Sequence, residues 1–162
     1  MTENQFSVRY SHLLFPQEVN QEIKALLEKA KDAANQAYAP YSGFKVGCAI
    51  LLENGKIAVG NNQENAAYPS GLCAERVALF HAMAENPELA IQKIAVVAPG
   101  KSNSEVIEPA TPCGSCRQAM AEYESRQKKP IEIFLWDQNV NVWLFHSVSD
   151  LLPFYFTGKN LQ

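Results

Sequence analysis

Three cysteines in two short, well-separated strings are the feature that most constrains this fold. The sequence CAE occupies positions 73–75, and PCGSC occupies positions 112–116. Cys113 and Cys116 have the i,i+3 spacing that puts two side chains on one face of a helix, so both can reach one ion. Zinc prefers four tetrahedral ligands, and a catalytic zinc site keeps one position for water. Cys73 would supply the third thiolate, which leaves the fourth zinc position free. The fold therefore has to bring Cys73, at the start of one helix, close to Cys113 and Cys116, at the start of another.

Neither string is decisive when taken alone. Cys113 and Cys116 could be a redox pair, and Glu75 could be a first-turn glutamate that the helix dipole favours. Together, however, the strings predict zinc and leave the Glu75 carboxylate free to move protons. A structural zinc site would need a fourth Cys or His near either string, and none is present. Cys48 is expected mid-strand as a small buried thiol.

Bulk composition narrows the class of protein further. The chain has 162 residues, 47% hydrophobic and 19% charged, as expected for one globular domain. Its formal net charge of −3 disfavours a nucleic-acid polymer as partner. No apolar run reaches the roughly 18 residues of a membrane span, and the N-terminus lacks a secretory pattern. We therefore expect a cytoplasmic protein with no membrane partner.

Helical and strand patterns alternate along the chain, which predicts a layered α/β fold. We expect an N-terminal lead-in over residues 1–16 and a single catalytic domain over residues 17–162. Asn-Gly at 54–55 predicts a tight hairpin turn. The expected helices are 17–38, 73–85, 113–125 and a short 149–152; the expected strands are 44–52, 57–61, 91–98, 131–136 and 140–145, and the segment 102–112 is expected to be a loop.

Four segments in this order and spacing resemble one known family. They are FKVG at 44–47, NQENAAY at 62–68, CAER at 73–76 and PCGSCRQ at 112–118, with a weaker match in LLP at 151–153 followed by Phe156. They are similar to the cytidine deaminases of the small, three-cysteine, homotetrameric zinc type. The resemblance implies a three-layer α/β/α fold with a five-stranded mixed sheet. It also implies one Zn²⁺ per subunit and a homotetramer whose subunits share active sites.

The resemblance further implies a reaction, hydrolytic deamination of cytidine and deoxycytidine in pyrimidine salvage. Zinc lowers the pKa of its bound water toward about 7, so hydroxide becomes available to attack C4 of cytosine. Glu75 would accept the water proton, protonate ring N3 and later protonate the leaving amine. The expected products are uridine or deoxyuridine and ammonia.

Roles for further residues are carried over from the family. Arg76 is expected to donate hydrogen bonds to the metal-binding thiolates. Asn62 and Glu64 alternate on an extended segment, so their side chains point the same way and are expected to bind the ribose hydroxyls. The remaining expected substrate contacts are Phe44, Ala74, Tyr68 and Phe156, of which Phe156 would reach a neighbouring subunit's site. Phe154 or Tyr155 could take that place instead.

Three other functions remain as alternatives. Deaminases of blasticidin S, a cytosine-nucleoside antibiotic, share the CAE and PCGxCRQ strings, although paired Asn62 and Glu64 favour an intact ribose. Editing of a polynucleotide would need a basic groove and stacking surfaces. A non-catalytic zinc module would need a fourth protein ligand and no Glu75.

Overall fold

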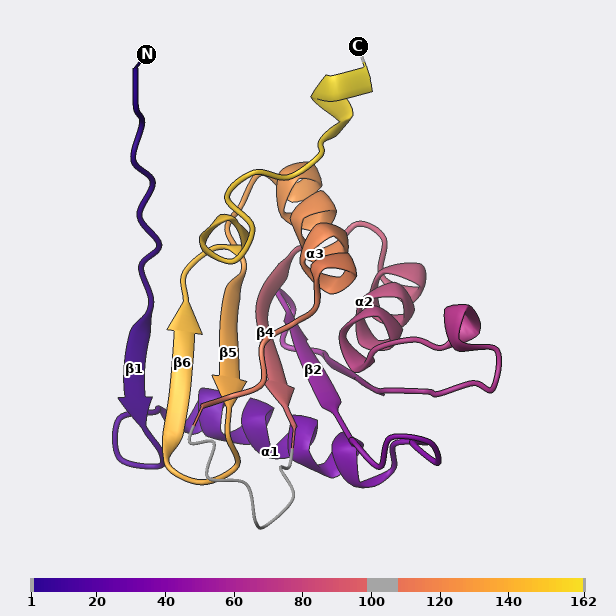
Figure 1. Ribbon diagram of the computed structural model, residues 1–162. Coiled ribbons are helices and arrows are strands. Elements are labelled where there is room, and N and C mark those ends of the chain that lie inside the picture. The colour runs from indigo at the N-terminus through magenta and orange to yellow at the C-terminus, as the bar shows by residue number, and fades with distance from the viewer. Residues whose placement is uncertain (1, 99–107, 162) are drawn as a thin grey trace.

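A single mixed sheet forms the centre of the computed structural model, which describes residues 2–98 and 108–161 (Figure 1). Its spatial strand order is β1-β6-β5-β4-β2-β3, in which β4 and β5 are parallel and all other neighbours antiparallel. The strands are β1 (Ser11–Leu14), β2 (Gly47–Leu52), β3 (Ile57–Asn61), β4 (Ile91–Val97), β5 (Glu132–Trp136) and β6 (Asn141–Phe145). The helices are α1 (Gln21–Asn35), α2 (Ala74–Glu85) and α3 (Gly114–Gln127), with 3₁₀ turns at Tyr68–Ser70, Val148–Asp150 and Gly158–Leu161.

Helices cover both faces of the sheet. Helix α1 crosses one face, and α2 and α3 lie side by side on the other (Figure 1). All six residues of β2 are buried because this strand lies between the two helix layers. Cys48 and Ile50 belong to the core under α2 and α3, whereas Ala49 and Leu51 belong to the core under α1. The alternation follows from the two-residue period of a strand.

Two glycines let the helices approach the sheet closely. A Cβ built on Gly60 of β3 would lie 2.4 Å from the backbone nitrogen of Ala78 in α2. A Cβ built on Gly47 of β2 would lie 1.9 Å from the carbonyl oxygen of Ala30 in α1. Only glycine fits at these two crossings. The glycines at positions 47 and 60 therefore allow each helix layer to lie this close to the sheet.

The expected three-layer α/β/α architecture is confirmed, but the expected count of five strands was wrong. Ser11–Leu14, which we assigned to the lead-in, forms β1 and pairs with the edge of β6. His12 Nε2 also lies 2.7 Å from the side-chain oxygen of Asn141. A strand of four residues contains only two repeats of the two-residue strand period, so its hydrophobic pattern is too short to recognise. Its position is set by backbone pairing with β6.

Helix α1 is shorter than the expected helix over 17–38. It begins after Asn20, whose side chain accepts a hydrogen bond from the backbone N–H of Ile23, 2.9 Å away. This is the usual N-cap interaction. At the other end, Tyr38 has left the helix and forms a bridge to Gln63. The chain is thereby tied beside the segment that contains Asn62 and Glu64.

The remaining elements fall within a few residues of their expected positions. The short helix expected at 149–152 is a 3₁₀ turn at Val148–Asp150. The first part of the loop expected at 102–112 lies outside the described residues. In the part of the chain that the structure describes, no helix has the length and apolar character to cross a membrane.

Candidate active site

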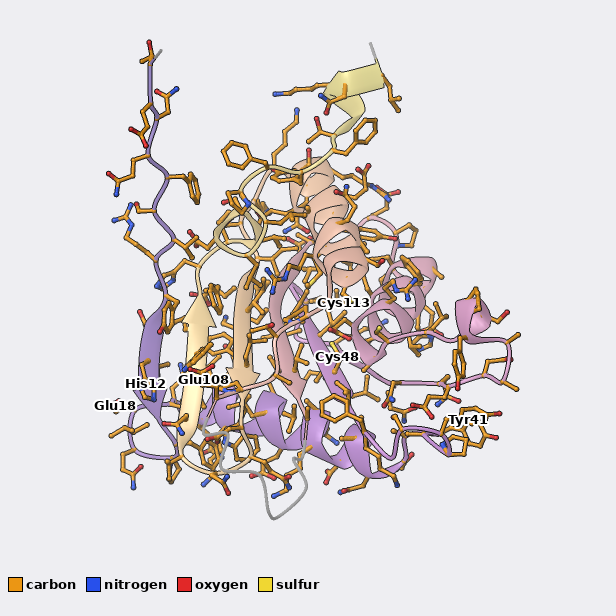
Figure 2. All side chains as sticks on the ribbon, viewed as in Figure 1. His12, Glu18, Tyr41, Cys48, Glu108 and Cys113 are labelled. Atoms are coloured by element: carbon orange, nitrogen blue, oxygen red, sulfur yellow. The ribbon has the colours of Figure 1, made fainter. Side chains whose placement is uncertain are left out.

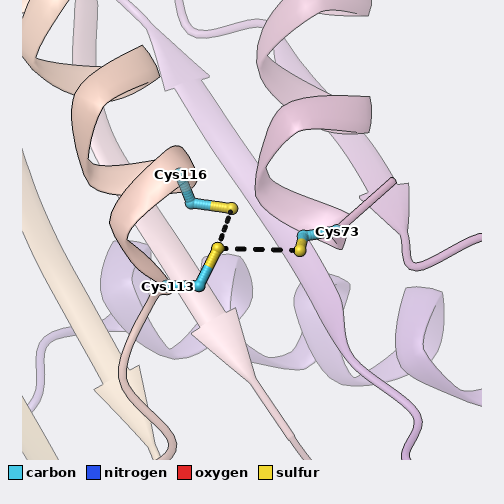
Figure 3. Close-up of side chains that lie close together, drawn as sticks. All are labelled: Cys73, Cys113 and Cys116. Atoms are coloured by element: carbon cyan, nitrogen blue, oxygen red, sulfur yellow. Dashed lines mark hydrogen bonds between the residues drawn. The ribbon is translucent and has the colours of Figure 1, made fainter. Parts of the chain in front are cut away.

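The three cysteines meet at one point between α2 and α3 (Figure 3). The sulfur atoms of Cys73 and Cys113 lie 3.9 Å apart, and those of Cys113 and Cys116 lie 3.5 Å apart. All three sulfurs lie within 4.8 Å of one another. Tetrahedral zinc with Zn–S bonds of about 2.3 Å separates two sulfurs by about 3.8 Å. The thiols therefore fit zinc, and they are the group of potential metal ligands found among the described residues.

The helix starts explain how these thiols are presented. Cys73 is the N-cap residue of α2 and Cys113 that of α3, positions at which Ser, Thr, Asp and Asn are usual. Neither cysteine uses its side chain to cap its helix, so both sulfurs remain available to a metal. The positive ends of the two helix dipoles point at the thiols and favour their ionised form.

The thiols differ in how readily they ionise. The neighbouring Cys116 thiol, with help from Arg76, lowers the pKa of Cys73 to about 5. The pKa of Cys116 is raised by its hydrogen bond to Cys73 and by burial. Cys48, which is fully buried under this cluster, has its pKa raised by desolvation and by the charge of Glu75. Cys48 thus remains a neutral packing residue, as expected from its place in β2.

Arg76 lies beside the thiols. Its guanidinium interacts with Cys73 and Cys116 and stabilises their negative charge. Its Nε is buried and has no hydrogen-bond partner in residues 2–98 or 108–161. Three thiolates on Zn²⁺ would leave about one excess negative charge, and the guanidinium of Arg76 carries the opposite charge.

Arg117 has a different role from Arg76. Its guanidinium donates hydrogen bonds to the carbonyl oxygens of Pro112 and Leu151, 2.7 and 2.8 Å away. The adjacent Gln118 donates from its side chain to the carbonyl oxygen of Phe156, 2.8 Å away. The second half of the PCGSCRQ string therefore fastens the C-terminal segment to α3.

Glu75 is buried in the first turn of α2, with 5% of its surface exposed. Burial raises the pKa of its carboxyl group, and the nearby Cys73 charge adds to this effect. A carboxyl group with a raised pKa can hold a proton closer to neutral pH than an exposed glutamate can. Its location one residue past Ala74 and two past Cys73 keeps it next to the thiol cluster.

A cavity of about 510 Å³ opens beside Cys73 and Arg76. Three of the residues expected to contact substrate, Asn62, Glu64 and Tyr68, also line it. Phe44 and Ala74 do not line this cavity. Phe44 is about half exposed, and Ala74 is fully buried. The volume suits one small molecule rather than a polymer strand.

Asn62 and Glu64 both turn toward the segment that precedes β2. The side chain of Asn62 accepts from the N–H of Val46 and donates to the carbonyl of Phe44, at 2.7 and 2.9 Å. The carboxylate of Glu64 accepts from Tyr41 and Ser42. Hydrogen bonds from Ser42 and Tyr41 lower the pKa of Glu64, so its carboxylate is ionised at neutral pH.

Sequence reasoning missed Tyr41 and Ser42, which both line the cavity. The APYSG string at 39–43 lies between the expected helix over 17–38 and the expected strand over 44–52, and no role is predicted for it from the sequence. Tyr41 lies on the loop between α1 and β2 (Figure 2), and its ring packs edge-on against Tyr68 with centroids 6.1 Å apart. The signal in the sequence was a tyrosine and a serine next to a glycine in a short loop. Only the fold shows that both donate hydrogen bonds to Glu64.

Phe156 lies away from this cavity within one chain. It is 57% exposed and borders a separate surface hollow together with Phe154 and Tyr155. Phe154 is 84% exposed and contacts the ring of Phe6. The C-terminal segment extends beyond the sheet (Figure 1), and its Phe154 and Phe156 side chains are exposed.

Comparisons with known proteins agree with this site. Residues 20–129 match the family model for the cytidine and deoxycytidylate deaminase zinc-binding region. A cytidine deaminase from Halalkalibacterium halodurans is 40% identical over 137 residues, which span 85% of this chain and 96% of that protein. The crystal structure of cytidine deaminase from Burkholderia pseudomallei is 43% identical, with a TM-score of 0.67 over 82% of this chain and 98% of that one.

A second solved structure, cytidine deaminase from Mycobacterium tuberculosis, has a TM-score of 0.64 and 30% identity. It covers 85% of this chain and 98% of its own. The three thiols, the buried Glu75 and the adjoining cavity thus lie within the matched region of the family model. This chain belongs to the cytidine and deoxycytidylate deaminase family.

Proposed function

We propose that this protein is a zinc-dependent hydrolase that deaminates cytidine, and also deoxycytidine, to the corresponding uracil nucleoside and ammonia. The observation that carries the proposal is a cluster of three thiols with a buried carboxyl group close by, next to a cavity of about 510 Å³ that Cys73 borders. Its family membership supports the same chemistry. The role in pyrimidine salvage and the cytoplasmic location belong to the proposal.

Cys73, Cys113 and Cys116 would hold the zinc ion, and Arg76 would offset the negative charge of the thiolates. When bound, zinc supplies Lewis acidity and makes water acidic enough to react at neutral pH. Three protein ligands leave room for that water, as catalytic zinc sites require.

Glu75 would carry out the proton transfers. Its carboxylate accepts a proton from the attacking water and donates it to ring N3 of the cytosine. It then takes the proton of the hydroxyl group that has been added at C4 and delivers this proton to the exocyclic amine. The C4–N bond breaks, C4 becomes a carbonyl carbon and the amine leaves as ammonia. Burial supports this role because a raised pKa lets one carboxyl group act as base and then as acid near neutral pH.

The polar end of the cavity would bind the sugar. Glu64 is an ionised acceptor and Asn62 an amide, which suits a pair of ribose hydroxyl groups. Tyr68 lines the same cavity. Phe44 and Ala74, which do not line it, are also proposed to contact the substrate. The overall charge of −3 is consistent with an uncharged nucleoside rather than a polyanion as substrate.

Assembly is also proposed. We expect a homotetramer in which Phe156 of one subunit reaches the active site of another. The exposed aromatic side chains of the C-terminal segment support this arrangement, since they lie away from the cavity of their own chain.

The activity is tested by the fall in ultraviolet absorbance when zinc-loaded protein converts cytidine to uridine. Glu75→Gln keeps the shape of the side chain but cannot shuttle protons. We expect kcat to fall at least about a thousandfold while zinc content and melting temperature stay close to wild type.

Zinc content measured by atomic absorption is the control in that experiment. A wild-type protein that is folded and zinc-loaded but leaves cytidine unchanged would contradict the proposal. A Glu75→Gln enzyme with near-normal kcat would instead remove Glu75 from the mechanism while leaving the reaction in place.

A further inference from the structure

Ser42 stands between two groups that the proposed function assigns to the substrate. Its hydroxyl oxygen accepts a hydrogen bond from the backbone N–H of Phe44, 2.9 Å away. With that acceptor position occupied, its own proton is directed to the Oε1 atom of Glu64. One hydroxyl thus joins the backbone at Phe44 to the carboxylate of Glu64.

The same loop also holds the second oxygen of Glu64. The backbone N–H groups of Tyr41 and Ser42 donate to Oε2 at 2.8 and 3.3 Å. Gly43, with φ of +68°, closes the turn, and its N–H donates to the carbonyl of Ala39. A residue with a side chain rarely adopts this backbone conformation. The loop is therefore built to present donors to Glu64.

Asn62 continues this network on the other side of Phe44. Its side chain bridges the carbonyl of Phe44 and the N–H of Val46. Ser42, Phe44, Asn62 and Glu64 consequently form one hydrogen-bonded chain, of which Ser42, Asn62 and Glu64 line the cavity.

We propose that Ser42 is a positioning residue that sets sugar specificity by fixing the carboxylate of Glu64; this inference rests on the proposed function. Three donors on the loop side leave the remaining lone pairs of Glu64 directed elsewhere, toward the cavity it lines. An ionised carboxylate only accepts hydrogen bonds, so it selects sugars that carry hydroxyl donors. Ser42 acts through Glu64 and touches none of the reacting atoms.

The test compares cytidine with 2′,3′-dideoxycytidine, which lacks the sugar hydroxyls that Glu64 would bind. For Ser42→Ala we expect KM for cytidine to rise about tenfold with kcat within about twofold of wild type, because one hydrogen bond to a charged group is lost. Its kcat/KM for dideoxycytidine should match wild type. Ser42→Thr restores a hydroxyl and should recover most of the KM. Ser125→Ala, at an exposed position near the end of α3, is the matched control.

Three kinetic results would overturn the inference. Equal losses on both nucleosides, or a loss confined to kcat, would mean that Ser42 acts on loop folding or on the reaction centre. An unchanged KM for cytidine would mean that the hydroxyl does not position Glu64.

A measurement without turnover separates this inference from the proposed function. Carboxyl ¹³C NMR follows the titration of Glu64, whose pKa should move up toward its ordinary value in Ser42→Ala. An unshifted titration contradicts the positioning role even in an inactive protein. A wild-type enzyme that fails on cytidine, with the titration shifted as expected, would remove the substrate assignment instead.

Discussion

At the scale of single residues, the cysteines of this chain differ in how readily they ionise. Cys73 at a helix start is easily ionised, with a pKa of about 5, because the Cys116 thiol and Arg76 stabilise its charge. Cys116 and Cys48 are fully buried, and both have raised pKa values. Sequence spacing predicted the three metal ligands and separated Cys48 from them. The ionisation of each thiol, however, depends on neighbours that the fold supplies.

These differences predict a pattern of alkylation by iodoacetamide. In metal-free protein at pH 7, Cys73 should react at least about tenfold faster than Cys48, since only the thiolate is nucleophilic. As pH falls through about 5, Cys73 becomes protonated and its rate should drop. Added zinc should protect Cys73, Cys113 and Cys116. Peptide mass spectrometry measures each site, with urea-unfolded protein as the control in which Cys48 also reacts. Unprotected ligand cysteines in zinc-loaded protein would contradict the metal assignment.

At the scale of elements, the site depends on how closely α2 packs on the sheet. Cys73 and Glu75 stand at the start of α2, whose backbone passes directly over Gly60 of β3. Periodicity predicted this helix and strand, and both were found within a residue of the expected bounds. The tight crossing between them was not visible in the sequence, because a glycine in a strand has several possible causes.

Gly60→Ala should therefore damage both stability and metal binding. The added methyl group meets backbone atoms of Ala78 and Ala74, which cannot move without α2. We expect the free energy of unfolding to fall by about 2–3 kcal/mol, and zinc affinity to fall with it. Urea denaturation and competition with a zinc chelator measure the two effects.

Gly47→Ala is the matched control for Gly60→Ala. Its methyl group would press on α1, across the sheet from the thiols, and should lower stability by a similar amount. Zinc affinity of the folded protein should then stay near wild type. Equal losses of zinc affinity in both variants would show that the site senses general destabilisation rather than the position of α2.

At the scale of the whole molecule, the N- and C-terminal segments lie at the edges of the three-layer α/β/α core. β1 extends the sheet at the β6 edge. The C-terminal segment is attached to α3 by the hydrogen bond from the Gln118 side chain to the carbonyl oxygen of Phe156. The aromatic ring of Phe156 remains exposed. An exposed aromatic ring on an anchored backbone suits contact with a second subunit, as proposed above.

A shared active site predicts complementation between two weakened enzymes. Phe156→Ala should lower kcat/KM roughly tenfold, and Glu75→Gln is expected to be inactive. Mixed oligomers made by co-refolding should exceed the average of their parents, because intact Glu75 and intact Phe156 meet in some sites. Phe154→Ala, at an exposed neighbouring position, is the control and should leave kcat/KM near wild type. Purely averaged activity would place Phe156 outside the partner's site.

The sequence by itself determined the parts of this protein that depend on local spacing. The i,i+3 cysteines, the cysteine at the other helix start and the adjacent glutamate predicted the zinc cluster and its carboxyl group. Alternating strand and helix patterns predicted three layers. These features are local because a helix turn and a strand pleat have fixed periods that fewer than ten residues reveal.

Only the tertiary structure decided which distant segments meet. Backbone pairing added Ser11–Leu14 as a sixth strand, although its short pattern carried little hydrophobic signal. The fold also brought Ser42 onto Glu64 across 22 positions and Gln118 onto the carbonyl of Phe156 across 38. Contacts of this kind depend on the packing of whole layers against a sheet, and no local period in the chain encodes them.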